Sequence, residues 1–278
     1  MQQPQRLGVV ITTYNSPRWL AHVLSGYETQ TDPNFTVIIA DDGSTDDTRA
    51  LIDEVNARGR LNLVHVWHED QGFRKCTILN KAIAETDCDY LVFTDGDCIP
   101  REDFIATHKA MAAPNTFLSG GYIKLTMPVS EAITEADIRS GAVFKRDWLT
   151  QHGQPNTHKL WKLTRRPWLV KLLNSLTPTK ATWNGMNSST WTQDIKDANG
   201  FNEDMQYGGL DRELGERLWN KGLVSRQIRY SAVCLHLDHA RGYAKPEIWA
   251  KNRAIRDEVK ATGRYKAKNG IEKLETPD

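Results

Sequence analysis

Two aspartates separated by one glycine, Asp95-Gly96-Asp97, are the residues of this 278-residue sequence best suited to metal chemistry. They directly follow the apolar run Tyr90–Thr94, which is typical of a buried strand. Two carboxylates at a strand terminus can share one hard divalent cation, and Mn²⁺ or Mg²⁺ so held would neutralise a diphosphate leaving group. The glycine between them would let the backbone approach a phosphate closely.

Two other segments carry residues that suit the same chemistry. In Gln71–Lys75 (QGFRK), Arg74 could form a bidentate hydrogen bond with a diphosphate, and Lys75 could offer it a single positive charge. In Cys234–Arg241 (CLHLDHAR), two histidines three residues apart, His236 and His239, could supply a metal ligand after a strand. Solvated charge at a helix start and structural histidines are the open alternatives.

A carboxylate of the second half, Asp211, follows the turn Gly208-Gly209 and opens a predicted helix over Asp211–Lys221. The helix dipole and the unpaired N–H groups of a first turn favour a carboxylate there. An acid that only caps its helix gives the same pattern, so both interpretations stay open.

The elements that must position these residues alternate between strand and helix patterns over the first hundred residues. Strands are predicted over Leu7–Ile11, Phe35–Ala40, Leu63–Trp67 and Tyr90–Thr94. Helices are predicted over Cys76–Ala84 and after two N-cap residues, Ser16, which is followed by Pro17 at the first helical position, and Ser44. This alternation predicts a parallel sheet whose ligands lie at the carboxyl ends of the strands. Those ends are all polar, and the GxGxxG and GxxxxGK[ST] phosphate motifs are absent.

Composition restricts the partners and the location. The net charge is +1, from 36 Lys+Arg and 35 Asp+Glu, which argues against a nucleic-acid partner. The four cysteines form no CxxC pair, the first residues do not resemble a signal peptide, and no apolar run reaches the roughly 18 residues of a membrane span. We therefore expect a cytoplasmic protein.

One basic segment leaves a membrane contact open. Ala142–Lys180 has eight lysines and arginines against a single acid, Asp147. Within it, Arg165–Leu173 could form an amphipathic helix that meets anionic lipid or a phosphorylated glycolipid, on the cytoplasmic face of the membrane. The basic region Lys251–Lys273 could extend that surface. The alternative is a solvated basic face whose tryptophans pack on the core.

Four motifs in order resemble the family 2 glycosyltransferases of the GT-A fold, over about residues 6–110. They are LGVVITTYN (Leu7–Asn15), VIIADDGSTDDT (Val37–Thr48), DQGFRKCTILNKA (Asp70–Ala82) and LVFTDGDCIP (Leu91–Pro100). The resemblance implies an α/β fold with a Rossmann-like, mostly parallel central sheet flanked by helices and an acceptor-side subdomain. We expect a nucleotide-sugar-binding half over 1–110, an acceptor-binding and catalytic-base half over 111–240, and a basic C-terminal extension over 241–278.

The second half is similar to inverting galactosyl- and N-acetylgalactosaminyltransferases, including chondroitin-polymerase-like enzymes. Their W-G-G-E-D pattern before a helix matches Tyr207–Asp211, with Leu210 in place of the family's glutamate. The resemblance implies that Asp211 is the general base. Glu213 is the second candidate, and Glu203 and Asp204 are more distant ones.

The same resemblance implies roles for the remaining site residues. The metal, Mn²⁺ or Mg²⁺, would be held by Asp97 and a histidine, with His239 fitting best, His236 still open, and Asp95 in support. Nucleotide contacts are implied for Thr12, Asp42 and Tyr14, diphosphate contacts for Arg74 and Lys75, and sugar-hydroxyl contacts for Asn187 in the WNGMN segment (Trp183–Asn187).

The implied reaction is inverting, metal-dependent transfer of a hexose or N-acetylhexosamine from a nucleotide diphosphate sugar to a hydroxyl. UDP is the expected nucleotide. The expected acceptor is a bacterial-type surface glycan or glycolipid, such as lipopolysaccharide core, O-antigen or capsule. Two other functions remain open, a sugar nucleotidyltransferase and a catalytically silent glycan-binding protein on the same fold.

Overall fold

The computed structural model describes residues 3–239 and 246–273. The end of the CLHLDHAR motif, at 240–241, and parts of the expected C-terminal extension, 241–245 and 274–278, lie outside the described residues. The strands are β1 (Leu7–Thr13), β2 (Thr36–Asp41), β3 (Asn62–Trp67), β4 (Tyr90–Asp95), β5 (Cys98–Pro100), β6 (Thr116–Lys124), β7 (Ser188–Trp191) and β8 (Val224–His236). The helices are α1 (Pro17–Tyr27), α2 (Asp46–Ala57), α3 (Lys75–Glu85), α4 (Phe104–Met111), α5 (Met127–Ala132), α6 (Glu135–Arg139), α7 (Arg146–Gln151), α8 (Pro167–Leu176), α9 (Thr192–Asp197), α10 (Leu210–Asn220) and α11 (Pro246–Thr262), with 3-10 helices η1 (Ala142–Phe144) and η2 (His158–Leu163).

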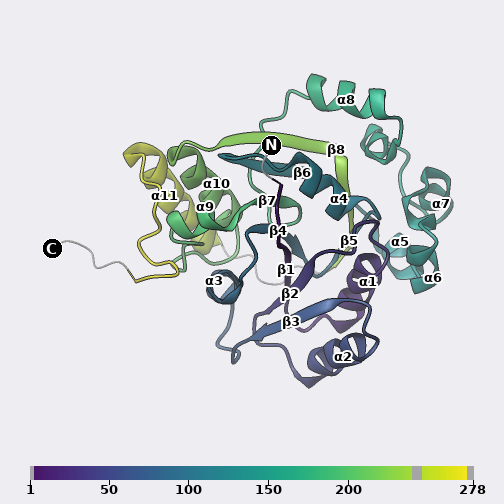
Figure 1. Ribbon diagram of the computed structural model, residues 1–278, viewed down its shortest axis with the longest axis horizontal. Coiled ribbons are helices and arrows are strands. Elements are labelled where there is room, and N and C mark those ends of the chain that lie inside the picture. Colours follow the sequence, from purple (N-terminus) through teal and green to yellow (C-terminus); the bar gives the residue numbers. More distant parts are fainter. Residues whose placement is uncertain (1–2, 240–245, 274–278) are drawn as a thin grey trace.

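One mixed sheet runs through the described part of the chain, in the strand order β3-β2-β1-β4-β7-β6-β8-β5 (Figure 1). The four N-terminal strands pair in parallel, which confirms the βαβ prediction for the first hundred residues. Beyond β4 the sheet changes character, because β7 is antiparallel to both β4 and β6, and β5 is antiparallel to β8. The α/β fold expected from the sequence is therefore confirmed.

Both faces of the sheet are covered, so its central strands are continuous apolar runs instead of alternating patterns. In β1, Val9 and Ile11 belong to one apolar cluster, together with residues of α1, α2 and α4. Val10, between them, belongs to a second cluster with residues of α3, α9 and α10. Figure 1 shows α1 and α2 on one side of the sheet and α3, α9 and α10 on the other.

Ser44 connects two of the site-bearing loops and does not cap a helix as predicted. Helix α2 begins at Asp46 with Thr45 as its N-cap residue. The Ser44 hydroxyl instead accepts a hydrogen bond from the Asn15 amide (2.8 Å), and its own amide donates to Asp41 Oδ1 (2.8 Å). The loop after β1 is thereby tied to the loop after β2. Ser16 does precede α1, but its side chain forms no capping hydrogen bond.

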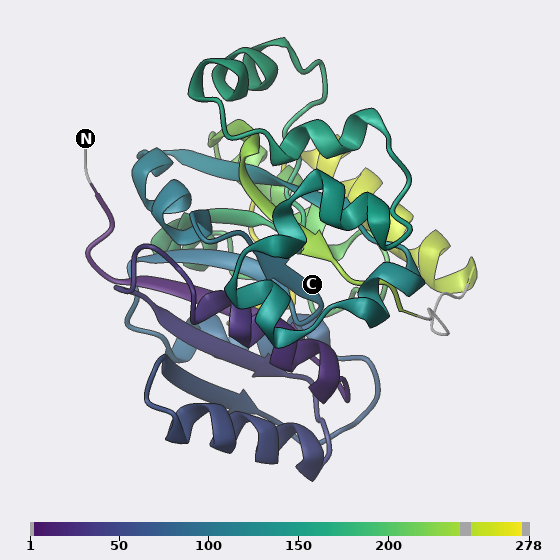
Figure 2. The same ribbon diagram turned by 90° about the vertical axis from the view of Figure 1, so that its right-hand side faces the viewer.

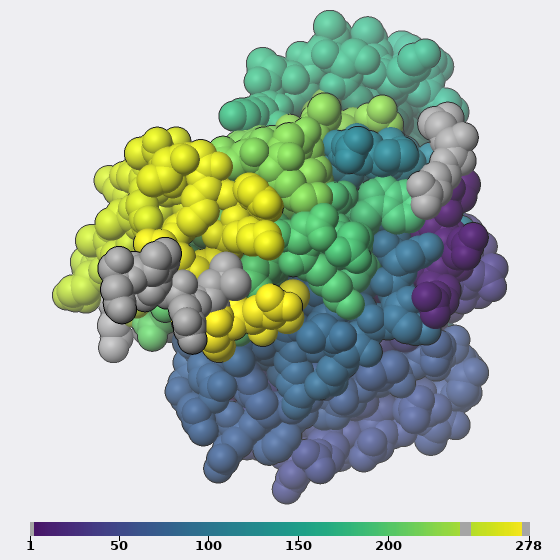
Figure 3. Space-filling view, turned by 60° about the vertical axis from the view of Figure 1, so that its left-hand side comes forward, coloured from purple at the N-terminus to yellow at the C-terminus, as the bar shows by residue number. Residues whose placement is uncertain are grey.

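The C-terminal segment packs beside the loop that leads into α10, as Figure 3 shows in yellow against green. The side-chain amide of Asn252, in α11, donates to the backbone carbonyls of Gln206, Tyr207 and Gly208. Arg256 forms an ion pair with Glu216 of α10 at 2.6 Å. Among the described residues, no helix is both long enough and apolar enough to cross a membrane.

A buried ion pair fixes α10 to the end of α9. Glu213 and Arg217 are both fully buried and 2.8 Å apart. The Arg217 guanidinium also donates to the carbonyls of Ala198 and Gly200, so its N–H groups have hydrogen-bond acceptors in the core. A protein with a buried ion pair of this kind is hardly more stable than one with hydrophobic residues at both positions. Removing only one partner, however, leaves the other as an uncompensated buried charge.

We therefore predict that Arg217→Met lowers the free energy of unfolding by about 3–5 kcal/mol, because Glu213 loses its counter-charge in the core. The measurement is urea unfolding at neutral pH. Lys268→Met is the matched control, because its ion pair with Glu258 is exposed (53% and 43%). The control should cost at most about 1 kcal/mol. Equal losses in the two variants would contradict this account of α10.

Candidate active site

The ends of β1 and β4 bring Asp95 next to Thr12. The two residues are directly paired across the parallel strands, and the Thr12 hydroxyl donates to Asp95 Oδ1 at 2.8 Å. The Gly96 amide then donates to the Thr12 carbonyl at 2.7 Å. A Cβ on Gly96 would lie 2.9 Å from that carbonyl oxygen. Gly96 is therefore required for the backbone contact with β1. This reason differs from the one expected from the sequence, which was a close approach of the backbone to a phosphate.

Lys75, the first residue of α3, is the cation at the centre of the site. Its ammonium donates to Asp95 Oδ1 at 2.6 Å. Burial alone would lower the pKa of Lys75, but the charges of Asp95, Asp211 and Asp97 outweigh this effect and hold the pKa above its ordinary value. Carboxylates from two distant segments, Asp95-Gly96-Asp97 and the start of α10, therefore act on one ammonium group.

Asp211 lies in the first turn of α10, after Gly209 in the left-handed conformation at φ +86°. Its carboxylate approaches Gly185, where a Cβ would lie 2.7 Å from Asp211 Oδ1, so only glycine allows this position. Among the described residues, this oxygen has no hydrogen-bond partner. Burial raises the pKa of Asp211 to about 6, opposed by the Lys75 ammonium and the Gly185 amide and assisted by Asp95.

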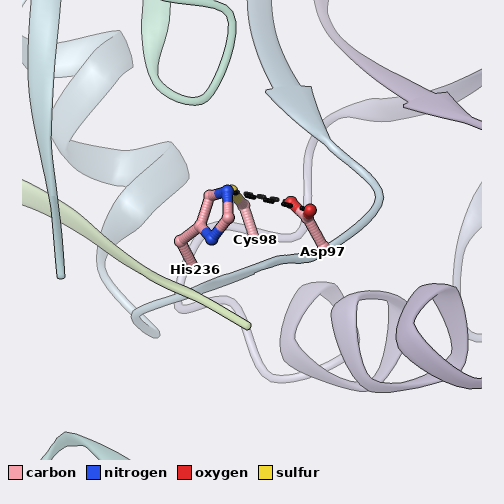
Figure 4. A group of neighbouring side chains, drawn as sticks. All are labelled: Asp97, Cys98 and His236. Carbon is pink, nitrogen blue, oxygen red and sulfur yellow. Dashed lines mark hydrogen bonds and ion pairs between the residues drawn. The ribbon is translucent and has the colours of Figure 1, made fainter. Parts of the chain in front are cut away.

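A second cluster surrounds Asp97, in the turn between β4 and β5. The antiparallel pairing of β5 with β8 places Cys98 opposite His236. His239 Nε2 lies 3.1 Å and His236 Nε2 3.8 Å from Asp97 Oδ2. Figure 4 shows the imidazole of His236 and the thiol of Cys98 beside the Asp97 carboxylate. Both histidines that the sequence left open are therefore near the same carboxylate.

The donors of this cluster suit a divalent cation. Burial would raise the pKa of Asp97, but His239 and His236 outweigh it and hold the pKa below its ordinary value, so the carboxylate is ionised. Burial raises the pKa of Cys98 well above its usual range, so the thiol stays protonated and donates to Asp97 Oδ1 at 3.3 Å. One carboxylate and two imidazoles, without a thiolate, fit manganese better than the all-oxygen preference of magnesium.

The loops after β1, β2 and β3 form the opposite part of the site. Asp42 Oδ1 lies 2.8 Å from His68 Nε2, and Asp42 Oδ2 accepts the Arg74 backbone amide at 3.0 Å. Burial raises the pKa of Asp42, although both of these neighbours oppose the shift. The Tyr14 hydroxyl donates to Asp70 Oδ2 at 2.9 Å, and the Tyr14 side chain remains half-exposed.

The expected sugar contact of Asn187 is wrong, because this residue is fully buried. Its amide nitrogen donates to the carbonyls of Gly121 and Ala232, and its oxygen lies 2.9 Å from His108 Nε2. Asn187 therefore connects β6, β7 and β8 inside the protein. In the same WNGMN segment, Trp183 is also core, and Gly185 is the residue that contacts Asp211.

The other candidates for the general base, Glu213, Glu203 and Asp204, each contact other residues of the protein. Glu213 is held by Arg217 in the core. Glu203 accepts hydrogen bonds from Thr77, Asn80 and Lys273, and Asp204 accepts one from Asn269. The Arg74 guanidinium donates to Gln71 Oε1 at 2.6 Å, so Lys75 is the basic residue of this motif that the carboxylates surround.

Three site residues were missed by sequence reasoning: Gly185, His68 and Cys98. Gly185 sits inside a motif that was recognised, but only its approach to Asp211 explains the glycine. His68 belongs to the polar end of β3, where no spacing points to Asp42. Cys98 directly follows Asp97, but its role depends on burial, which the sequence does not show.

Comparison with known proteins agrees with this geometry. Residues 8–117 match the family model described as glycosyl transferase family 2. Over 253 residues the chain is 27% identical to chondroitin synthase from Escherichia coli, covering 83% of this chain and 34% of that protein. It is 29% identical over 242 residues to validoxylamine A glucosyltransferase from Streptomyces hygroscopicus, covering 80% of this chain and 54% of that protein. The chain thus spans about a third to a half of these relatives.

Two solved glycosyltransferases share the fold. TarS residues 1–349 from S. aureus, in complex with UDP-GlcNAc, superimpose with a TM-score of 0.61 at 16% identity, over 93% of this chain and 69% of that chain. The mannosyltransferase PcManGT from Pyrobaculum calidifontis, in complex with GDP-Man and Mn²⁺, gives 0.56 at 20% identity, over 87% and 59%. The protein has a GT-A fold, and its residues 8–117 match glycosyltransferase family 2, a family of transferase enzymes.

We predict that the Asp97 cluster binds Mn²⁺ through Asp97 and the two histidines. Titration followed by the electron paramagnetic resonance of free Mn²⁺ should show one site in the wild type. Asp97→Asn should abolish it, and His239→Ala should weaken it about 10–100-fold, because removing a neutral ligand leaves the carboxylate in place. Asp103→Asn, away from the cluster beside Arg101, is the control. Unchanged Mn²⁺ binding in Asp97→Asn would contradict the assignment.

Proposed function

We propose that the protein is an inverting, metal-dependent glycosyltransferase that moves a hexose or N-acetylhexosamine from UDP to a hydroxyl of a bacterial-type surface glycan. The observation that carries the proposal is the position of Lys75, whose ammonium donates to Asp95 at 2.6 Å and whose pKa the charges of Asp211 and Asp97 also raise. Lys75 thus links Asp97, at the expected donor end of the site, to Asp211, the expected base, although 114 positions separate these two aspartates.

The donor is proposed to lie along the carboxyl ends of β1, β2 and β4. Asp42 is a buried carboxylate that can accept N–H groups of a nucleobase or ribose hydroxyls. Thr12 lies near the end of β1, and Tyr14 lies in the loop that follows β1. The UDP-GlcNAc complex of TarS and the GDP-Man complex of PcManGT support a nucleotide sugar as donor. We favour UDP, in keeping with the motif resemblance to UDP-sugar enzymes.

Charge development during transfer explains the other side chains. As the bond from the anomeric carbon to the diphosphate breaks, the sugar gains oxocarbenium character and the diphosphate gains negative charge. Lys75 can stabilise part of the negative charge on the diphosphate, since its ammonium stays protonated among the carboxylates. A divalent cation bound by Asp97, His236 and His239 would neutralise further charge on the diphosphate.

Asp211 is proposed to remove the proton of the acceptor hydroxyl. Its pKa of about 6 leaves it ionised at neutral pH yet more basic than an ordinary aspartate, as general-base catalysis favours. The Asp211 Oδ1 is shielded from solvent and accepts no hydrogen bond from the described residues, so its lone pairs are uncommitted. One base and one displacement invert the anomeric centre.

The acceptor is proposed to be a glycan or glycolipid of the bacterial surface, lipopolysaccharide core, O-antigen or capsule. The similarity to a chondroitin synthase supports a sugar hydroxyl as acceptor. Of the nearby glycines, Gly185 lets the Asp211 carboxylate approach the backbone, whereas Gly208 and Gly209 face Trp249 and Arg256. A cytoplasmic location follows if the donor is a cytoplasmic UDP-sugar.

We predict that Asp211→Asn loses about 10²–10⁴ in kcat while its affinity for UDP with Mn²⁺ is unchanged, because the amide cannot accept the proton. A panel of UDP-sugars with glycan acceptors, read by UDP release and product mass, supplies the rate. Binding is measured separately by calorimetry.

Asp204→Asn is the matched control, because it makes the same chemical change at a carboxylate that accepts a hydrogen bond from Asn269. It should retain the wild-type rate. Transfer by Asp211→Asn within about tenfold of the wild type would reject Asp211 as the base. Transfer to none of the acceptors by the wild type would reject the proposed acceptor class.

A further inference from the structure

Helix α8 projects from the body of the protein and buries none of its residues (Figures 1 and 2). Trp168, Leu172 and Leu176 follow one another at intervals of four and therefore share one face. Their exposed fractions are 64%, 45% and 68%. On the other side, Asn174 donates to the Ser231 hydroxyl of β8 at 2.9 Å. The helix is thus fixed by a polar contact and presents its apolar stripe to solvent.

The chain around this stripe is basic and has no acid. From Trp148 to Lys180 there is no aspartate or glutamate, and the basic residues are Lys159, Lys162, Arg165, Arg166, Lys171 and Lys180. A solvated helix of a neutral protein normally carries both signs of charge. An apolar stripe bordered only by cations is the pattern of a helix that lies in an anionic lipid interface.

The structure shows which of these cations remain available. Arg165 pairs with Glu102, and the Lys162 ammonium donates to the Tyr122 carbonyl at 2.8 Å. Arg166 and Lys171 are exposed and form no ion pair with the described part of the chain. Lys171 also lines a groove of about 620 Å³ between α8 and β8, which the exposed Arg226 lines from the other side.

We propose that α8 is a peripheral membrane-binding helix for an anionic bilayer. Trp168, Leu172 and Leu176 enter the headgroup boundary, where tryptophan is favoured. Arg166, Lys171 and Arg226 contact lipid phosphates, and the groove receives a headgroup. A second copy of this chain is a poorer occupant, because like-charged faces would repel each other. This inference goes beyond the proposed transfer reaction and does not depend on it.

The test is co-sedimentation of the whole chain with vesicles of phosphatidylcholine, with or without phosphatidylglycerol, in the absence of sugar substrates. The wild type should bind the anionic vesicles, bind less as salt rises, and leave the neutral vesicles unbound. Trp168→Glu with Leu172→Glu should weaken binding at least about tenfold. Lys171→Ala and Arg166→Ala should each weaken it about fivefold.

Val64→Glu is the matched control, because Val64 is 46% exposed on β3, at the opposite end of the strand order from β5 and β8. It should bind vesicles as the wild type does. Thermal unfolding checks that all variants fold, as expected for exposed positions.

Three results would overturn the proposal. One is no binding to anionic vesicles, and another is equal binding to neutral ones. The third is a wild-type dimer in light scattering that Leu172→Glu converts to a monomer, without vesicle binding, since the stripe would then join two copies. Transfer to a soluble acceptor is a separate measurement, so failure here leaves the reaction unaffected.

Discussion

The site depends on one partly buried ammonium group, Lys75, on which the charges of three carboxylates act. Like charges at close range in a poorly hydrated site repel strongly, and a single cation cannot neutralise three of them. The arrangement therefore retains an excess of negative charge, which favours a divalent cation at Asp97. The same field, together with burial, keeps Asp211 more basic than an ordinary aspartate.

Long-range contacts hold this charge arrangement in place. Parallel register sets Asp95 beside Thr12, and the β5–β8 pairing carries His236 to Asp97. The position of Asp211 depends on the turn at Gly209 and on the absence of a side chain at Gly185. The buried Glu213–Arg217 pair then fixes α10, the helix that carries Asp211, against α9. Most of the polar interior thus serves to orient a few reactive groups.

The sequence predicted well what depends on local pattern. Continuous apolar runs located β1, β2 and β4, because strands buried on both faces need no alternation, whereas the edge strand β3 alternates in burial. It also selected Asp95, Asp97, Lys75 and the two histidines, since polar residues after strands meet at one sheet edge. Their chemical roles in transfer remain predictions.

The features of the site and fold that the sequence did not predict depend on burial and on contacts between distant segments. The family resemblance of the WNGMN segment implied a sugar contact for Asn187, but tertiary packing buries this residue against His108. Ser44 has the composition of a helix cap, but it connects two loops because Asn15 lies within reach. The pairing of Glu213 with Arg217 fits helical spacing, but only its complete burial distinguishes it from an ordinary surface pair.

The most direct measurement is the titration of the Asp211 carboxyl group, followed by the NMR signal of ¹³C-labelled aspartate and assigned with Asp211→Asn. The account predicts a pKa of about 6 in the wild type. It predicts a still higher value in Lys75→Met, because the ammonium stabilises the ionised carboxylate. A titration near the ordinary value of about 4, unchanged in Lys75→Met, would contradict it, because Asp211 would then face water outside the shared site.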